Sequence, residues 1–434
     1  MVMVVLPSWT SSGSATRATS LLGDEHYKER PRPGIIQTPA SRSSPAPTPT
    51  PSSAPTRTSG RTPPPAPTVC SGVALSPSSD LQAAINGAPS GTTFCLASGT
   101  YHPSSLAPKS GDVVDGGNRQ AVWDGQGTLT YAVHSSSASN VTLRGLVIQN
   151  YNNPAQSGAI QSFGSSGWVL ANNDINHNHG VGVAVDGGAQ VLNNHLWYNH
   201  QEGYACHGNH DLFQGNEIDH NNWLMEYSPG WEAGGGKCWA TQYLTFRDNY
   251  SHDNGGPGLW TDTDNVYTTY DSNTVKNNWG AGIFHEISYA ATISNNNVSG
   301  NGFGESNGWL WDAGIQISSS GGQSAATPIA IYGNTVTNNY NGIGLLQQNR
   351  GSGALGTYLV QNVNVHDNTV TMSRGGTGVV QDDSDNGVWT RNVTFVHDSY
   401  TVSNHSGMWF AWAGDYLGWP AWRVLGLDAT GSLT

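Results

Sequence analysis

The chain has 434 residues, of which 55 are Gly and 39 are Asn; only 11% are charged, and the formal net charge is -13. This Gly and Asn content disfavours a helical bundle and indicates a turn-rich, mostly β protein. The acidic balance disfavours nucleic acid as a partner, and the sequence contains no run of about 18 apolar residues that could span a membrane.

The N-terminal part differs in composition from the rest. Thirteen of the 22 Pro precede residue 70, where seven Lys or Arg stand against three Asp or Glu; the later residues carry 10 against 27, a net charge of -17. A Pro-, Ser- and Thr-rich sequence cannot bury enough apolar surface to fold, so we expect residues 1–67 to be a disordered linker. Its start, MVMVVLPSW, lacks the parts of a complete signal peptide, so a real leader and an over-extended gene start both remain open.

Four cysteines follow, and their spacing does not match a zinc ribbon. An even number of cysteines in an acidic chain that bears a linker fits an oxidising compartment, so we expect a secreted protein. We predict a disulfide between Cys70 and Cys95. Cys206 and Cys238 form either a second disulfide or two buried free thiols.

A repeated pattern dominates the remaining sequence. Segments such as NDINHNHGVG, NTVKNNWGAG and NTVTNNYNGIG have two Asn five residues apart, followed by Gly and a short apolar run. The pattern recurs every 21 to 24 residues, with a few longer steps. Asn and Gly both tolerate the positive φ angles of tight turns, and stacked Asn amides can form a hydrogen-bonded ladder. Because the Leu-rich frame of a leucine-rich repeat is absent, we predict a parallel β-helix with about three short strands per coil.

The segment DLQAAINGAPSGTTFCLASGTYH, residues 80–102, resembles the opening of right-handed parallel β-helix proteins of the pectin-lyase-like superfamily. The later segment WPAWRVLGLDATGS is similar to their C-terminal stretch. The resemblance implies an all-β, single-stranded right-handed parallel β-helix over residues 68–434, with a short N-terminal capping helix. The superfamily includes polysaccharide lyases, glycoside hydrolases, epimerases, phage tailspikes and adhesins, so the fold does not define the reaction.

Aligning the coils on the Gly before each apolar run predicts which side chains face outward, because successive strand residues alternate. The fourth residue after this Gly is then Asp186, His207, Cys238, Asp262, Glu286, Ser318, Gln348 or Asp382. Asp262 and Glu286 should lie on neighbouring coils about 4.8 Å apart, beside Trp260 and Phe284. Paired carboxylates raise each other's pKa or share a cation, and the aromatic pair suits a sugar ring. A solvated polar ladder is the alternative.

Other titratable residues lie close to this pair in the sequence. Asp264 faces the same side if its strand continues, which makes it a further catalytic candidate. Strict alternation directs His285 inward as a core residue, whereas a local bulge would make it catalytic. Beyond them, a solvated or ion-binding end is expected to contain Arg350, Asp382, Asp383 and Asp385.

Two insertions of nine residues occur at the same corner of the coil, in NWLMEYSPGWEAG and GFGESNGWLWDAG. They flank the coils of Asp262 and Glu286, so we expect them to form the walls of a cleft. Three Trp in these segments are candidate sugar contacts: Trp231, Trp309 and Trp311. Simple loop variation is the alternative.

Glu232 and Lys237 resemble the Glu-x4-Lys arrangement of certain calcium-dependent β-helix polysaccharide lyases. The resemblance implies that the Glu holds calcium on the substrate carboxylate and that a Lys with lowered pKa abstracts the C5 proton. We therefore take Lys237 as a candidate base, and Glu232, Asp262 and Asp264 as candidate calcium ligands. The following coil has no Arg to serve as the acid, and a structural salt bridge is the alternative for Lys237.

These observations predict a monomeric, secreted, carbohydrate-active protein with a polysaccharide as its partner. The first hypothesis is a calcium-assisted lyase that cleaves a uronate-containing polysaccharide by β-elimination. The second is a glycoside hydrolase in which Asp262 acts with Glu286 or Asp264 as the acid and base pair. The third is a non-catalytic glycan-binding or surface protein.

Overall fold

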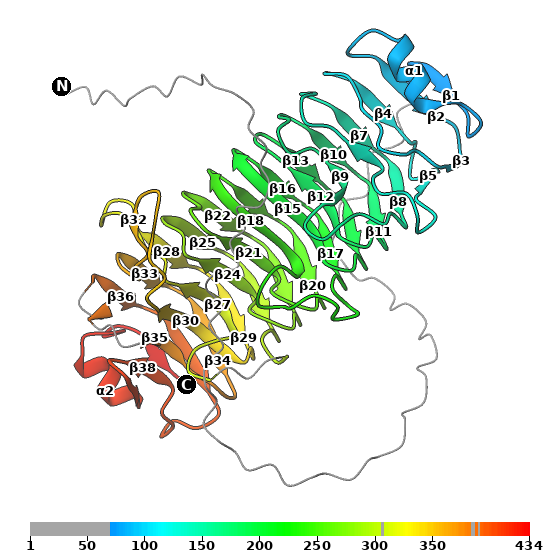
Figure 1. Cartoon of the computed structure of the whole chain (residues 1–434). Coiled ribbons are helices and arrows are strands. Elements are labelled where there is room, and N and C mark those ends of the chain that lie inside the picture. Colours follow the sequence, from blue (N-terminus) through cyan, green and yellow to red (C-terminus); the bar gives the residue numbers. More distant parts are fainter. Residues whose placement is uncertain (1–69, 305–307, 383–386, 389–390) are drawn as a thin grey trace, which may run out of the picture. The chain divides into compact units, whose positions relative to one another are not determined.

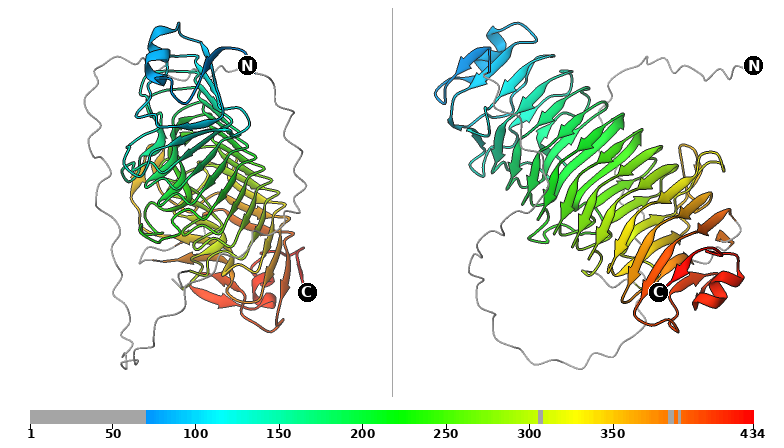
Figure 2. Two further views of the ribbon diagram at one scale, coloured as in Figure 1. Left: turned by 90° about the vertical axis from the view of Figure 1, so that its right-hand side faces the viewer. Right: turned by 180° about the vertical axis from the view of Figure 1, so that it is seen from behind.

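Short strands stack on one another from coil to coil along residues 70–434 (Figure 1 and Figure 2). The computed structural model describes these residues apart from 305–307, 383–386 and 389–390. The linker predicted over residues 1–67 lies outside the described residues, as do Asp383 and Asp385. Three long sheets run along the stack, and most coils add one strand to each. The chain is therefore the parallel β-helix that its repeat predicts.

Sheets A and B each contain 13 strands within the described residues, and their neighbouring strands are parallel. Sheet A consists of β1 (Val73–Leu75), β2 (Thr93–Leu96), β4 (Val113–Asp115), β7 (Thr142–Arg144), β10 (Val169–Ala171), β13 (Gln190–Leu192), β16 (Leu212–Gln214), β19 (Thr245–Arg247), β22 (Thr268–Asp271), β25 (Ala291–Ser294), β28 (Ile329–Tyr332), β33 (Val363–His366) and β36 (Val393–Val396). Sheet B consists of β3 (Gly99–Tyr101), β5 (Ala121–Asp124), β8 (Leu146–Gln149), β11 (Asp174–Asn176), β14 (His195–Trp197), β17 (Glu217–Asp219), β20 (Tyr250–His252), β23 (Thr274–Lys276), β26 (Asn297–Ser299), β29 (Thr335–Thr337), β34 (Thr369–Met372), β37 (Ser399–Val402) and β40 (Ser432–Leu433).

Sheet C carries the candidate site and is parallel except for its last, antiparallel pair. It consists of β6 (Val133–His134), β9 (Gly158–Gln161), β12 (Val181–Val185), β15 (Glu202–Asn209), β18 (Gly234–Gln242), β21 (Leu259–Asp262), β24 (Ile283–Glu286), β27 (Ala313–Ser318), β30 (Asn341–Gln347), β35 (Thr377–Gln381), β38 (Phe410–Trp412) and β39 (Asp415–Leu417). A separate antiparallel hairpin pairs β31 (Ser352–Gly353) with β32 (Gly356–Thr357).

Short helices lie at both ends of the stack. Helix α1 (Leu81–Gly87) begins after Asp80, whose side chain accepts a hydrogen bond from the Ala83 N–H at 2.9 Å and so satisfies one of the free donors of the first turn. Leu81 and Ile85 belong to the buried core, as expected for the predicted capping helix. At the other end, helix α2 (Trp419–Val424) contributes a buried Trp to the same core. Within the described residues, no helix has the length and apolar character needed to cross a membrane.

The interior of the coils contains columns of side chains from successive strands. In sheet A the rings of Phe213, Phe246 and Tyr270 follow one another with centroids 5.2 and 5.3 Å apart. In sheet C a disulfide joins the register partners Cys206 and Cys238 across adjacent coils. Of the two alternatives left open for these cysteines, the disulfide is the one present, and the predicted Cys70–Cys95 disulfide is confirmed as well.

Two ladders of buried Asn occupy the turns on either side of sheet B. One contains Asn173, Asn194, Asn216, Asn249, Asn273, Asn296, Asn334 and Asn368, and the other contains Asn178, Asn199, Asn221, Asn254, Asn278, Asn301 and Asn339. The pattern is regular at Asn273, whose Oδ1 accepts from the N–H and the Nδ2 of Asn249 at 3.0 and 2.9 Å. Its own Nδ2 donates to the Phe246 carbonyl at 3.0 Å. Each Asn thus forms hydrogen bonds with backbone N–H and C=O groups that have no partner in a neighbouring strand.

The predicted register holds at the centre of sheet C and fails at two strands. Asp262 is the register partner of Glu286, and Glu286 is the partner of Ser318. Cys238, however, is the partner of Thr261 and is wholly buried, so it faces the core instead of solvent. β18 begins with three consecutive Gly, and its later residues are shifted by one position relative to the alignment. Gly234 has a φ of 120°, a backbone conformation that favours glycine.

The alignment is also wrong by two residues at β30. Ile315 pairs with Ile343, so the outward position after Ser318 is held by Leu346 and then by Val380. Gln348 and Asp382 therefore do not continue the column of Asp262.

Long connections lie at two corners of the coil. The two predicted insertions join β17 to β18 and β26 to β27, at the corner between sheets B and C. A third long connection, which the sequence analysis did not identify, joins β30 to β33 and contains the β31–β32 hairpin. Both kinds of connection contribute residues to the candidate site.

The Asn ladder makes a testable contribution to stability. Replacing Asn273 by Ala leaves two Asn249 donors and the Phe246 carbonyl unsatisfied, so we expect the free energy of unfolding to fall by about 3 to 9 kcal/mol, at roughly 1–3 kcal/mol for each of these three buried polar groups. Chemical denaturation measures this change. The matched control is Asn297→Ala on the next coil, where the side chain is exposed and a change within about 0.5 kcal/mol is expected. Equal denaturation midpoints for the two variants would contradict a structural role of the ladder.

Candidate active site

The outer face of sheet C brings two carboxylates together at β21 and β24. Asp262 and Glu286 end these neighbouring strands as register partners. Two residues earlier on the same face, Trp260 and Phe284 are also partners, and their rings stack with centroids 5.3 Å apart. Strand alternation therefore produces the acid pair that the sequence predicts.

Lys237 joins this face from the preceding strand, because its register partner is Trp260. Its Nζ lies 2.6 Å from Asp262 Oδ2 and 3.0 Å from Glu232 Oε1. It also donates to the Trp231 carbonyl at 3.0 Å and lies 4.2 Å from the centroid of the Trp260 ring. The side chain is 7% exposed, so the ammonium group is surrounded by its partners.

These contacts determine the protonation of Lys237. Burial lowers the pKa of Lys237, but the charges of Asp262 and Glu232 outweigh this effect and raise it above the ordinary value for Lys. This direction is opposite to the lowered pKa that the lyase hypothesis expects of Lys237. The physical reason is that two carboxylates stabilise the charged ammonium more than burial disfavours it.

The pKa values of Glu286 and Glu232 are both raised. An exposed carboxylate in an ion pair would instead have a lowered pKa. Burial raises the pKa of Glu286 and the charge of Asp262 raises it further, while Arg350 opposes the shift. Burial also raises the pKa of Glu232, against the effect of Lys237. Glu286 therefore retains a proton to higher pH than an ordinary Glu does.

Arg350 completes this arrangement and was wrongly assigned to a remote solvated end. Its Nη1 donates to Glu286 Oε1 at 2.6 Å. The residue lies in the connection after β30, two coils beyond Glu286, and this connection folds back over the outer face. The available signal was the step of 34 residues between Asn334 and Asn368, which is longer than the base period.

Glu202 is a second residue that the sequence analysis missed. It begins β15, is 1% exposed and is the register partner of Gly234. Burial raises its pKa well above the ordinary value, and the charge of Glu232 acts in the same direction. The available signal was a charged residue directly before the Gly on which the coils are aligned.

The predicted aromatic platform is covered in the structure. Trp260 and Phe284 are only 2% and 7% exposed and pack against Trp311, so neither offers an open face to a sugar. The rings that solvent reaches lie in the two insertions instead. Trp231 is 52% exposed and Trp309 is 39% exposed.

Asp264 points away from the proposed calcium ligands. Its Oδ1 accepts hydrogen bonds from the Tyr358 hydroxyl at 2.8 Å and from the Ala354 N–H at 2.9 Å. Glu232 and Asp262 both contact the Lys237 ammonium group, which occupies the position between them. The structure therefore does not bring the three expected ligands to one point.

His285 faces the core, as strict alternation predicts, and is not directed toward the acid pair. It is wholly buried between the Thr261 hydroxyl and the Tyr289 carbonyl, each 2.7 Å from a ring nitrogen. Burial lowers its pKa to about 4, so the ring is neutral at physiological pH. Its role as a catalytic candidate is not supported by this position.

The acid pair can be reached from solvent. The side chains of Asp262 and Arg350 are 15% and 25% exposed. Two surface hollows of the described chain lie elsewhere, one beside Tyr289 and the other beside His207, and no candidate residue lines either of them. The cleft between the two insertions stays a prediction.

The comparisons agree with this architecture. The family model described as "Right handed beta helix region" matches residues 158–339. The chain folds as a right-handed parallel β-helix. No curated protein matches its sequence.

Several solved structures resemble this β-helix. The A-module of mannuronan C-5 epimerase AlgE6 from Azotobacter vinelandii is 17% identical with a TM-score of 0.52, over 82% of this chain and 93% of that one. The alginate lyase from Paenibacillus sp. str. FPU-7 is 13% identical with a TM-score of 0.36, over 80% and 97%. The endo-xylogalacturonan hydrolase from Aspergillus tubingensis is 13% identical with a TM-score of 0.29, over 77% and 87%. At these identities the likeness concerns the fold alone.

Removing the Lys237 ammonium group should destabilise the β-helix in a pH-dependent manner. In Lys237→Met, Asp262 and Glu232 lose their buried counter-ion, so we expect a loss of about 3 to 5 kcal/mol at neutral pH. The raised pKa of Lys237 means that its contribution is present below the ordinary Lys pKa and is lost only at strongly alkaline pH. Toward acidic pH the deficit of the variant should shrink, because Glu232 and Glu286 take up protons and repel less.

Denaturation midpoints at several pH values measure this effect. Lys276→Met, at an exposed position of β23, is the matched control and should change stability little. A deficit of Lys237→Met that stays constant from neutral to acidic pH would show that the ion pairs are not its cause.

Proposed function

We propose that this protein is a secreted polysaccharide hydrolase that cleaves glycosidic bonds at Asp262 and Glu286. The observation that carries the proposal is the pairing of these two carboxyl groups on adjacent strands in different environments. Asp262 contacts the Lys237 ammonium group, whereas Glu286 is more deeply buried and has a raised pKa. Glycoside hydrolysis requires two carboxyl groups in different states, one that donates a proton and one that is ionised. The two disulfides support an extracellular location.

The roles follow from these environments. Glu286 keeps its proton and donates it to the leaving glycosidic oxygen, while Asp262 attacks the anomeric carbon as a carboxylate. The bond to the leaving oxygen breaks as the ester between Asp262 and the sugar forms. A water molecule then cleaves this ester after Glu286, now a carboxylate, removes one of its protons. Arg350 stabilises the Glu286 carboxylate between the two steps, since it lies 2.6 Å from it.

The charge distribution favours a neutral glycan. The residues after position 69 carry a net charge of -17, and Glu232, Asp262 and Glu286 lie together at the site. Such a surface repels a polymer of uronates. Exposed Trp231 and Trp309 supply aromatic faces on the two insertions for contacts with neutral sugars.

Substitution of the two acids tests the assignment. Asp262→Asn and Glu286→Gln should each lower the release of reducing ends from a panel of neutral polysaccharides by roughly 100- to 10,000-fold, the usual contribution of a catalytic acid or base. Activity of the wild type should decline as pH rises through the raised pKa of Glu286, because the acid must be protonated. Asp248→Asn, at an exposed position outside sheet C, is the matched control. Full activity of Asp262→Asn would remove this residue from the mechanism.

The spacing of the acids predicts the stereochemistry. Adjacent parallel strands lie about 4.8 Å apart, which is closer to the roughly 5–5.5 Å of retaining enzymes than to the 6.5–9.5 Å of inverting ones. The first product should therefore keep the anomeric configuration of the substrate, as followed by proton NMR during the early reaction. An inverted first product would exclude the attack by Asp262.

A uronate lyase is the second candidate, and Arg350 is the observation that favours it. Lys237 and Arg350 place two cations beside the acid pair, and the sequence alone offered no such Arg. Calcium would enter only in this alternative, where it would neutralise the substrate carboxylate. Products with the ultraviolet absorbance of an unsaturated sugar would establish the lyase. Glycan binding by the wild type without any product would instead establish a non-catalytic role.

A further inference from the structure

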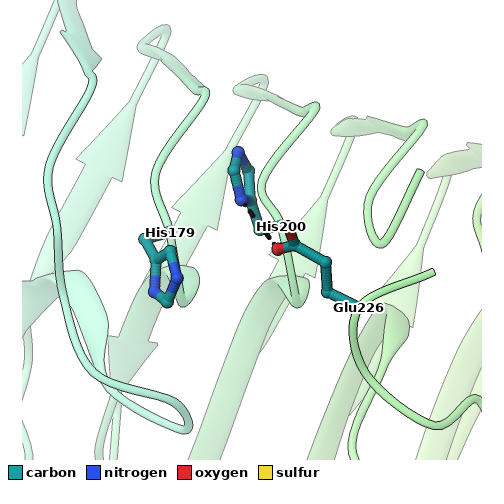
Figure 3. Close-up of side chains that lie close together, drawn as sticks. All are labelled: His179, His200 and Glu226. Carbon is teal, nitrogen blue, oxygen red and sulfur yellow. Dashed lines mark hydrogen bonds and ion pairs between the residues drawn. The ribbon is translucent and has the colours of Figure 1, made fainter. Parts of the chain in front are cut away.

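A second group of chemically reactive side chains lies at the corner between sheets B and C, apart from the acid pair. His179, His200 and Glu226 each offer one ligand atom, and these three atoms lie within 4.8 Å of one another. Figure 3 shows the Glu226 carboxylate directed at the His200 ring, with His179 on the neighbouring coil. None of the three takes part in the reaction proposed above.

We propose that His179, His200 and Glu226 bind a divalent transition-metal ion, of which Zn²⁺ fits best. Two imidazoles and one carboxylate are a ligand set that zinc adopts with a fourth position left for water. The ion would join the first insertion to the two preceding coils. This inference does not depend on the reaction assigned to Asp262 and Glu286.

The scaffold holds the two His side chains at a fixed spacing. Each follows an Asn of the same ladder, and the Asn178 Nδ2 donates to Asn199 Oδ1 at 2.9 Å. His179 and His200 thus occupy equivalent turns of adjacent coils, and their ring centroids are 5.6 Å apart. Ligands placed by a stacked backbone need little rearrangement to meet one ion.

The orientation of the His179 ring also fits a ligand. Its Nδ1 lies 3.3 Å from the Asn153 carbonyl, to which it donates, so Nε2 is the nitrogen left to bind a metal. A His that ligates a metal through one nitrogen commonly donates through the other to a carbonyl. His200 approaches Glu226 directly, with Nδ1 3.0 Å from Oε2.

The third ligand comes from the first insertion, which begins after β17. The Asn222 side chain closes the turn before Glu226: its Oδ1 accepts from the Tyr227 N–H at 3.2 Å and its Nδ2 donates to the Tyr227 carbonyl at 2.9 Å. The same insertion ends with Trp231 and Glu232, which contact Lys237. A metal at Glu226 would therefore restrain the segment that contributes to the acid pair.

A second His and carboxylate group, His195 with Glu217 and Asp219, fits a metal less well. His195 and His220 donate to Asp219 at 2.6 and 2.7 Å. Burial raises the pKa of Asp219, but these hydrogen bonds outweigh it and lower the pKa to about 2. His195 and Asp219 already bond to each other, so this group serves as the comparison in the experiment.

Titration of the whole protein with Zn²⁺ alone, after treatment with a chelator and dialysis, tests the site. Isothermal calorimetry should give one ion per chain for the wild type, and His200→Ala and Glu226→Gln should each weaken binding by at least about 10-fold. His405→Ala, at an exposed position near the C-terminal end, should bind as the wild type does. Circular dichroism establishes that each variant is folded.

Hydrogen exchange of residues 222–233 supplies a second measurement. Zn²⁺ should slow exchange of this insertion in the wild type and leave it unchanged in His200→Ala. The proposal is overturned if the wild type binds no Zn²⁺, so that His200 and Glu226 form only a salt bridge. It is equally overturned if His195→Ala abolishes binding while His200→Ala does not.

Discussion

The stacking of Asn amides in the turns is the interaction on which the rest of this structure depends. A turn leaves backbone donors and acceptors that no strand satisfies, and an unsatisfied buried polar group is costly. Asn273 shows the solution, since its amide bonds to backbone and side-chain groups of the preceding coil. Because an amide can make these bonds only when coils are in step, the ladders fix the position of each coil relative to the next.

A fixed register turns sequence spacing into rows of side chains on the outer face. Asp262 and Glu286 therefore stand side by side, and Lys237 stands one coil before them. Close packing of these charges is tolerated because each carboxylate contacts a cation. Lys237 lies between Glu232 and Asp262, while Arg350 contacts Glu286 from the other side.

The protonation of these side chains bears on which reaction the site can catalyse. One fold can host several reactions, so the decision must come from the site itself. A Lys held between two carboxylates keeps its proton, which makes it a poor base and a good counter-ion. Buried Glu286 keeps its proton to higher pH than an ordinary Glu, and on this contrast rests the proposal of hydrolysis in place of β-elimination.

The connections between strands are where this β-helix departs from a regular solenoid. Glu232 and Arg350 reach the acid pair from two different corners of the coil. The first insertion also carries Glu226, which lies beside His200. Loops on a rigid scaffold can change without disturbing the ladders, and here they add Glu232 and Arg350 to acids that end two strands.

The sequence by itself determined the period, the turns and the pairing of Asp262 with Glu286. Those features follow from residue spacing within one coil, and the alternation of strand side chains is independent of context. Tertiary structure alone decided the shift at Gly234, the burial of Trp260 and the contact of Arg350 with Glu286. Each of these depends on how a connection packs against residues far away in the sequence. The spacing of residues along the chain does not predict where a connection packs, because its position depends on the packing of one coil against another.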